Sequence, residues 1–183
     1  MKKNTTIQIT LTGLLIALGI VIPMFSPLKI VIEPASFTLA SHVPVLIAMF
    51  ISPFSALAVA LGTAAGFFWG GFPIIIVLRA LTHVIFALAG SLYLMKNKNI
   101  LSKPIRLRAF SLIIALIHGL CEVAIVTAFY FSKSNQLSKY YEHGFFQSVI
   151  LLVGIGTVIH SMIDCELTYA VMAILRKQKS FEI

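Results

Sequence analysis

Long runs of apolar residues constrain this chain more than any other feature of its sequence. A membrane-spanning helix needs about 20 consecutive, mostly apolar residues. Four runs meet that requirement, at about 7–25, 73–95, 108–131 and 145–175. Only 11% of the 183 residues are charged, whereas a soluble domain carries about 25%. The chain is therefore predicted to be an all-α integral membrane protein.

The apolar stretch between the first two runs, residues 37–71, is too long for one helix. Pro53 interrupts it, and a proline disfavours the helical conformation at the residue before it. We divide it into a short second helix at 37–51 and a third at 54–71. The prediction is six transmembrane helices in a single domain, residues 1–183. The first run is interpreted as a retained span, since no small-residue cleavage site follows it.

The basic residues support this count and set an orientation. Most of the 14 lysine and arginine residues fall in the segments 1–6, 96–108 and 174–183, which six spans place on one side of the membrane. The positive-inside rule assigns that side to the cytoplasm, so both termini are predicted to be cytoplasmic in a bacterial plasma membrane. The net charge of +8 then reflects orientation beside an anionic inner leaflet, and nucleic-acid binding is not expected.

Ionisable residues recur at a spacing of four inside the last three long runs. The pairs are Arg79 with His83, His118 with Glu122, and His160 with Asp164. Residues four apart share a helix face, and ionisable groups within a membrane are rare and mark functional sites. At 1.5 Å per residue, Arg79 and Glu122 reach similar depths in the outer half of the bilayer. Two interpretations stay open: a structural ion pair, or a solute pocket open to the outside that includes His83 and His118.

Three further features bear on such a pocket. His160 is a candidate pocket residue near the middle of the bilayer, whereas Asp164 is expected nearer the cytoplasmic interface in a structural role. Aromatic residues gather at the outer helix ends, as in an interfacial belt, and Trp69 is the best candidate to stack on a planar ligand. The outer loop 26–42, with its near-alternating "KIVIE", is either a lid or a plain connector.

Several function classes lack their motifs in this sequence. There is no G-x-x-x-x-G-K-[ST] and no H-E-x-x-H, so ATP binding through a P-loop is excluded and no enzymatic activity is expected. The segments "HGLCE" and "HSMID" place histidine and carboxylate at a spacing that can ligate a metal, but a complete set of ligands is not evident. No metal or cofactor is therefore predicted, and the missing internal repeat weakens the case for a self-sufficient carrier.

The whole chain resembles the substrate-binding (S) components of energy-coupling factor (ECF) transporters, the bacterial vitamin importers. The resemblance rests on the length, the six expected spans, the basic N-terminus, the long first outer loop, and Gly13 and Ala17 at small-xxx-small spacing. The segment "PASFTLASHVPVLIAMFISPFSALAVALGTAAGFFWGGFPIIIVLRALTHVIFALAG" looks like the subgroup that takes small ring vitamins of the pyridine or pyrimidine kind.

This resemblance implies a vitamin pocket near the outer surface, formed by helices four to six and capped by the first outer loop. It also implies docking on a transmembrane coupling subunit that is driven by two ATPase subunits. The family's Ala-x-x-x-Ala motif on the first helix contacts the coupling subunit. Here Gly13 replaces the first alanine of that motif, and Ala17 matches the second.

In that setting Arg79 would hold a carboxylate or phenolate oxygen. His83, His118 and Glu122 would hold ring nitrogen and hydroxyl groups. Because Glu122 partly neutralises Arg79, pyridoxine and hydroxymethylpyrimidine fit slightly better than niacin. Two other functions stay open on the residues alone: a stand-alone proton-coupled carrier, and an intramembrane metal- or haem-binding protein.

Overall fold

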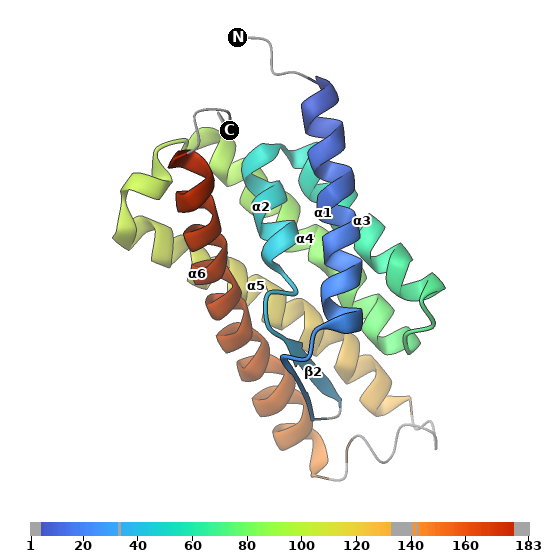
Figure 1. Ribbon diagram of the computed structural model, residues 1–183. Helices are drawn as coiled ribbons and strands as arrows, with labels where there is room; N and C mark the ends of the chain where they lie inside the picture. Colours follow the sequence, from blue (N-terminus) through green and yellow to red (C-terminus); the bar gives the residue numbers. More distant parts are fainter. Residues whose placement is uncertain (1–4, 33, 133–140, 142, 178–183) are drawn as a thin grey trace.

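The framework of the protein is a bundle of helices, shown in Figure 1. The computed structural model describes residues 5–32, 34–132, 141 and 143–177. Its helices are α1 (Thr5–Phe25), α2 (Val43–Ile51), α3 (Pro53–Trp69), α4 (Ile74–Lys96), the short 3₁₀ helix η1 (Ile100–Ser102), α5 (Pro104–Phe131), the π-helical η3 (Phe146–Ile155) and α6 (Gly156–Lys177).

Four helical segments are long and apolar enough to cross a bilayer. They are α1, α4, α5 and the continuous stretch Phe146–Arg176 that joins η3 to α6. The four runs predicted from the sequence are therefore confirmed as helices, as is the all-α membrane class. α3 is a shorter apolar helix, and its bounds lie within two residues of the predicted 54–71.

The predicted second helix at 37–51 is wrong in its first half. Residues before α2 form an antiparallel hairpin of β1 (Lys29–Ile32) and β2 (Ala35–Thr38), in which Ile30 pairs with Phe37. Ala40 then has a φ of 68°, a left-handed conformation that an α-helix cannot include. Only α2 remains helical, and its nine residues span about 14 Å, less than half of a hydrocarbon core of about 30 Å.

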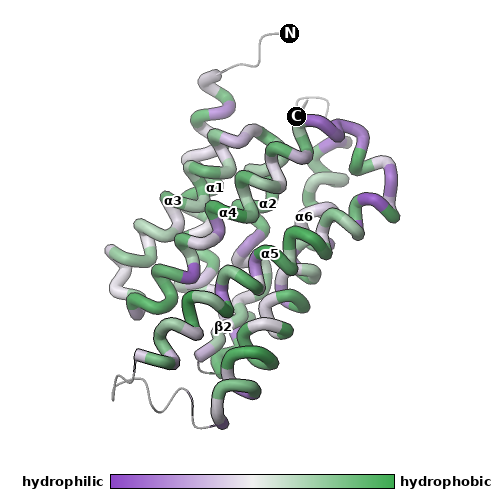
Figure 2. The backbone as a smooth tube through the Cα atoms, turned by 180° about the vertical axis from the view of Figure 1, so that it is seen from behind, coloured by the Kyte–Doolittle hydropathy of each residue, from purple (hydrophilic) through white to green (hydrophobic). Residues whose placement is uncertain are grey.

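The hairpin lies at one end of the bundle, with β1 exposed and β2 largely buried. α3 packs against α1, α2 and α4, and α5 packs against α4, α6 and η3. Figure 1 shows the start of α1 and the end of α6 at the end opposite the hairpin. Figure 2 shows hydrophilic positions gathered near that same end and apolar positions along the outer faces of the helices, as expected for helices that face lipid.

Small residues allow α1 and α3 to approach closely. A Cβ atom added to Gly62 would lie 2.8 Å from Ile16 Cγ2, and one added to Gly19 would collide with the Thr63 hydroxyl. Gly13 differs, because it is exposed and an added Cβ would have no described atom within 4 Å. Close approach of backbones is how small residues hold helices together in lipid, so Gly19 and Gly62 serve this contact and Gly13 is left for another role.

This difference predicts opposite outcomes for two matched substitutions. Gly19→Val inserts atoms into a filled contact and is expected to destabilise the protein by about 1–3 kcal/mol. The side chain added in Gly13→Val points into open space, so this variant should change the free energy of unfolding by no more than about 0.5 kcal/mol. Thermal unfolding of the two purified variants in the same detergent tests this, and equal melting temperatures would contradict the α1–α3 packing described above.

Candidate substrate-binding site

Arg79 of α4 and Glu122 of α5 meet in the interior of the bundle. Arg79 Nη2 donates to Glu122 Oε2 at 2.8 Å, and Arg79 Nη1 donates to the main-chain oxygen of Pro34 in the hairpin at 2.9 Å. The Thr157 hydroxyl of α6 donates to the same Oε2 at 2.6 Å. The arginine is 5% exposed and the glutamate 4%. The pair therefore joins α4, α5, α6 and the hairpin.

One nitrogen of the Arg79 guanidinium, Nε, is buried and has no hydrogen-bond partner among the described residues. A guanidinium offers five N–H donors in a fixed fork, and a buried donor without a partner costs about 1–3 kcal/mol. An acceptor that reaches Nε would relieve this cost.

Four histidines lie together beside the ion pair. Their rings come from α4 (His83), α5 (His118), α6 (His160) and the start of α2 (His42). The centroid of His42 lies 5.0 Å from that of His83, 4.7 Å from that of His118 and 4.9 Å from that of His160. All four are buried. The structure thus brings His83, His118 and His160 together, as the stripe pattern predicts.

The sequence interpretation missed His42, which is at the centre of this cluster. It lies in the outer loop, in the segment "ASHVP", at the N-terminal boundary of α2. Its position directly before a short apolar helix was the available signal, because a histidine there must either reach an aqueous interface or turn inward. It turns inward because Asp164 binds it.

Asp164 does not lie at the cytoplasmic interface, so that expectation is wrong. Its side chain is fully buried and accepts hydrogen bonds from the main-chain N–H of Ala40 at 2.8 Å and of His42 at 2.9 Å. His42 Nδ1 contacts Asp164 Oδ2 at 3.0 Å. The physical reason is that the segment after the hairpin enters the bundle and brings its N–H groups to the carboxylate. Asp164 therefore fixes the loop 26–42 to α6.

A cavity of about 80 Å³ lies between the hairpin and the helices. It is lined, among others, by Phe37 and Thr38 of β2, by His42, and by Arg79, His83, Glu122, Thr157 and His160. This volume is ample for ordered water, which needs about 10–15 Å³ of such space per molecule.

Comparison of the sequence with known proteins identifies the family of this chain. No protein-family model and no solved structure matches the chain. The chain is 37% identical over 182 residues to the "Niacin transporter NiaX" of Lactococcus lactis subsp. cremoris (strain MG1363), an alignment that covers 100% of this chain and 80% of the relative. The chain belongs to the S components of ECF transporters. It is a multi-pass protein of the bacterial plasma membrane.

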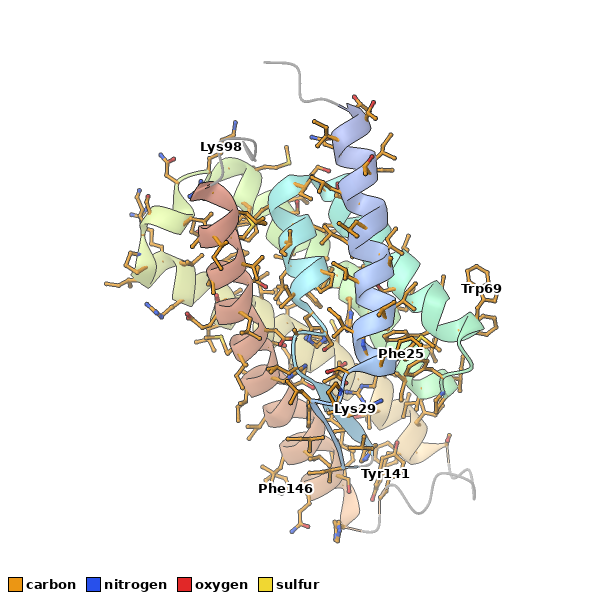
Figure 3. All side chains as sticks on the ribbon, in the orientation of Figure 1. Phe25, Lys29, Trp69, Lys98, Tyr141 and Phe146 are labelled. Carbon is orange, nitrogen blue, oxygen red and sulfur yellow. The ribbon has the colours of Figure 1, made fainter. Side chains whose placement is uncertain are left out.

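One residue expected in the pocket of this S component does not lie there. The Trp69 side chain is 81% exposed and is not among the residues that line the cavity. Figure 3 shows it pointing outward from the end of α3. The prediction that it stacks on a ligand is therefore corrected: Trp69 follows the general pattern of aromatic residues at membrane interfaces.

A larger hollow, of about 760 Å³, lies at the opposite end of this S component. Its lining includes Gln8, Pro53, Leu94, Lys98 and Arg176. The two cationic side chains there are exposed, whereas the smaller cavity is surrounded by buried ionisable groups from several helices. Binding sites combine apolar walls with a few convergent polar groups, so we place the candidate site at the smaller cavity.

Proposed function

We propose that this S component binds niacin from outside the cell and delivers it through a coupling subunit that is driven by two ATPase subunits. The observation that carries the proposal is the identity to a niacin transporter over the whole chain, together with a buried arginine at the cavity that has a free donor. The resemblance ranked pyridoxine and hydroxymethylpyrimidine slightly ahead. The name of the relative now favours niacin.

The chemistry of the cavity suits a pyridine carboxylate. A carboxylate takes charge-assisted hydrogen bonds from a guanidinium, and the proposed donor here is the free Nε of Arg79. The pyridine nitrogen needs a polar partner, and His42, His83 and His160 line the same cavity. Glu122 stays paired with Nη2 and keeps the charge of the empty pocket low, which explains why so buried an arginine is tolerated.

The hairpin is the lid in this proposal. It contributes Ser36, Phe37 and Thr38 to the cavity wall, and the Phe37 ring packs where Gly156 of α6 leaves room, since a Cβ there would come within 2.7 Å of it. We propose that the hairpin moves to admit the vitamin. It is held in place by the hydrogen bonds of Pro34 to Arg79 and of Ala40 to Asp164.

We also propose six membrane crossings with both termini in the cytoplasm. α1 begins and α6 ends at the same end of the bundle, together with the turn between α4 and α5 (Figure 1). That turn and its flanks carry Lys96, Lys98, Lys103 and Arg106, which favours the cytoplasmic side. α2 and α3 would supply the second and third crossings, with the hairpin continuing α2 to the outer surface.

Binding by the purified chain tests the function. Titration with nicotinate in detergent, with no ion gradient and no partner subunit, should give a dissociation constant on the order of 1 μM or tighter, and mass spectrometry should detect niacin that co-purifies. Tighter binding of pyridoxine would overturn the choice of vitamin. Transport by the chain alone that collapses when the proton gradient is removed would establish the rival carrier function.

The outer face of α1 gives a separate prediction about transport. Gly13 and Ala17 are both exposed, as a surface that docks on a coupling subunit requires. Gly13→Trp and Ala17→Trp are expected to leave nicotinate binding unchanged and to reduce ATP-driven uptake at least about tenfold, because a bulky side chain prevents close helix approach. Uptake by membrane vesicles that contain the complete complex is the measurement.

The matched control is Ile113→Trp on α5, since Ile113 is 57% exposed and lies on a different helix. It should leave both binding and uptake intact. Normal uptake by the two α1 variants would show that this face does not dock.

A further inference from the structure

We propose that His42, His83 and His118 form a binding site for a divalent transition-metal ion of the Zn²⁺ class. One ring nitrogen of each lies within 4.8 Å of the others, and all three side chains are buried. Zinc bonds to histidine nitrogen at about 2.0–2.1 Å, which puts tetrahedral ligands roughly 3.4 Å apart. The three nitrogens thus need a contraction of at most about 1.4 Å to close on an ion.

The hydrogen bonds behind two of the rings favour this use. His42 Nδ1 contacts Asp164 Oδ2 at 3.0 Å, and since an ionised carboxylate can only accept, Nδ1 carries the proton and Nε2 keeps its lone pair. A carboxylate behind a histidine is the usual support of a metal ligand, because it fixes the tautomer and raises the basicity of the ring. The Asp164 carboxylate is itself held by two main-chain N–H groups.

The His118 ring has a hydroxyl behind it on α6, which accepts from Nδ1–H in the tautomer that leaves Nε2 with its lone pair. Its Nδ1 lies 2.8 Å from the Ser161 hydroxyl. Its Nε2 is buried and makes no hydrogen bond to any described residue, and Glu122 Oε1 lies 3.4 Å away. His83 makes ring contacts with His42, Phe86 and His118, and no hydrogen bond of its side chain is found within the described segments. The buried Nε2 of His118, which has no hydrogen-bond partner among the described residues, is therefore available to a ligand.

A second grouping, of His42, His160 and Asp164, also satisfies the distances, but it fits less well. The two oxygens of Asp164 already accept from Ala40 and from two nitrogens of His42, so the carboxylate acts behind the histidine and not as a ligand. Three neutral imidazoles select zinc, copper, nickel or cobalt over magnesium and calcium, which prefer oxygen. Glu122 and Asp164 supply negative charge around the cation.

Three protein ligands leave one tetrahedral position for an exchangeable ligand. His42 and His83 line the cavity, so that position faces it. A water can fill the position, and a pyridine nitrogen can do so as well; the latter statement rests on the proposed function, whereas the metal site itself does not.

Zinc binding to the full-length chain in detergent, without any vitamin, tests the site. Isothermal titration with ZnCl₂ and elemental analysis should give one ion per chain, and Co²⁺ in its place should give the strong visible absorption of tetrahedral coordination. Loss of a supporting partner alone weakens metal sites about 10–100-fold. His83→Phe and His118→Ala are therefore expected to weaken binding roughly 100-fold or more, and Ser161→Ala about tenfold.

His143→Ala is the matched control, because His143 is exposed and outside the cluster; it should bind zinc as the parent does. His83→Phe keeps the ring volume, and its melting temperature without metal verifies that it is folded. A folded parent protein that binds no stoichiometric zinc overturns the proposal, as does equal loss of binding in His143→Ala and His83→Phe. Zinc binding in a protein that fails to bind nicotinate would leave this site standing and overturn only the proposed function.

Discussion

Arg79→Ala is expected to abolish nicotinate binding and to lower the free energy of unfolding by about 3–5 kcal/mol. The substitution removes the donor proposed for the vitamin carboxylate, and it leaves Glu122, which is 4% exposed, as a buried charge without its cation. Breaking a buried ion pair from one side has a cost of this size, and the surrounding lipid offers no water to lower it. Titration calorimetry and thermal unfolding measure the two effects.

A double variant separates binding from stability. Arg79→Met with Glu122→Gln removes both charges, and the glutamine can still accept from the Thr157 hydroxyl that now donates to Glu122. Replacing a buried pair by neutral groups is often close to neutral for stability, so this variant should unfold near the parent temperature and still fail to bind nicotinate. An unchanged dissociation constant for nicotinate in Arg79→Ala would show that Arg79 pairs with Glu122 but does not bind the vitamin.

Asp164→Ala is expected to release the outer loop from the bundle. The substitution leaves the N–H groups of Ala40 and His42 without their acceptor, at about 1–3 kcal/mol for each group that stays buried. The chain avoids most of this cost by exposing the loop. Hydrogen exchange at residues 35–43, followed by mass spectrometry, should therefore be at least about tenfold faster, while exchange in α4 and α5 should change little.

Glu166→Gln provides the control for this experiment. Glu166 lies on the same helix two residues further on, but its side chain is half exposed and pairs with Arg108 at 3.3 Å. Exposed pairs contribute at most about 1 kcal/mol, so exchange in the loop should match the parent. Equal protection of residues 35–43 in Asp164→Ala and the parent would show that the carboxylate does not hold the loop.

The sequence predicts the helices of this fold because each long run must satisfy its main chain internally within lipid. It also predicts the contact of Arg79 with Glu122, since two residues of opposite charge at equal depth must find each other. The four-residue spacing correctly brings His83, His118 and His160 to one interior region. These features follow from local periodicity and the bilayer alone.

The rest of the site depends on contacts that periodicity does not encode. Asp164 and His42 are 122 positions apart, and only the inward path of the loop brings them together. The segment 37–42 resembles the start of an apolar helix, but hairpin pairing and the turn at Ala40 override that preference. Trp69 sits near "GGFP" at a helix end, where an interfacial residue and a pocket residue have the same sequence context.

The left-handed turn at Ala40, with its φ of 68°, has a mechanical consequence. A non-glycine residue in this conformation is strained by about 1–2 kcal/mol, and the hydrogen bond from its own N–H to Asp164 is what keeps it there. The hydrogen bond to Asp164 thus opposes the tendency of Ala40 to return to a negative φ. In the proposed opening of the hairpin, loss of this hydrogen bond would let Ala40 relax, and that relaxation would offset part of the free energy needed to move the hairpin.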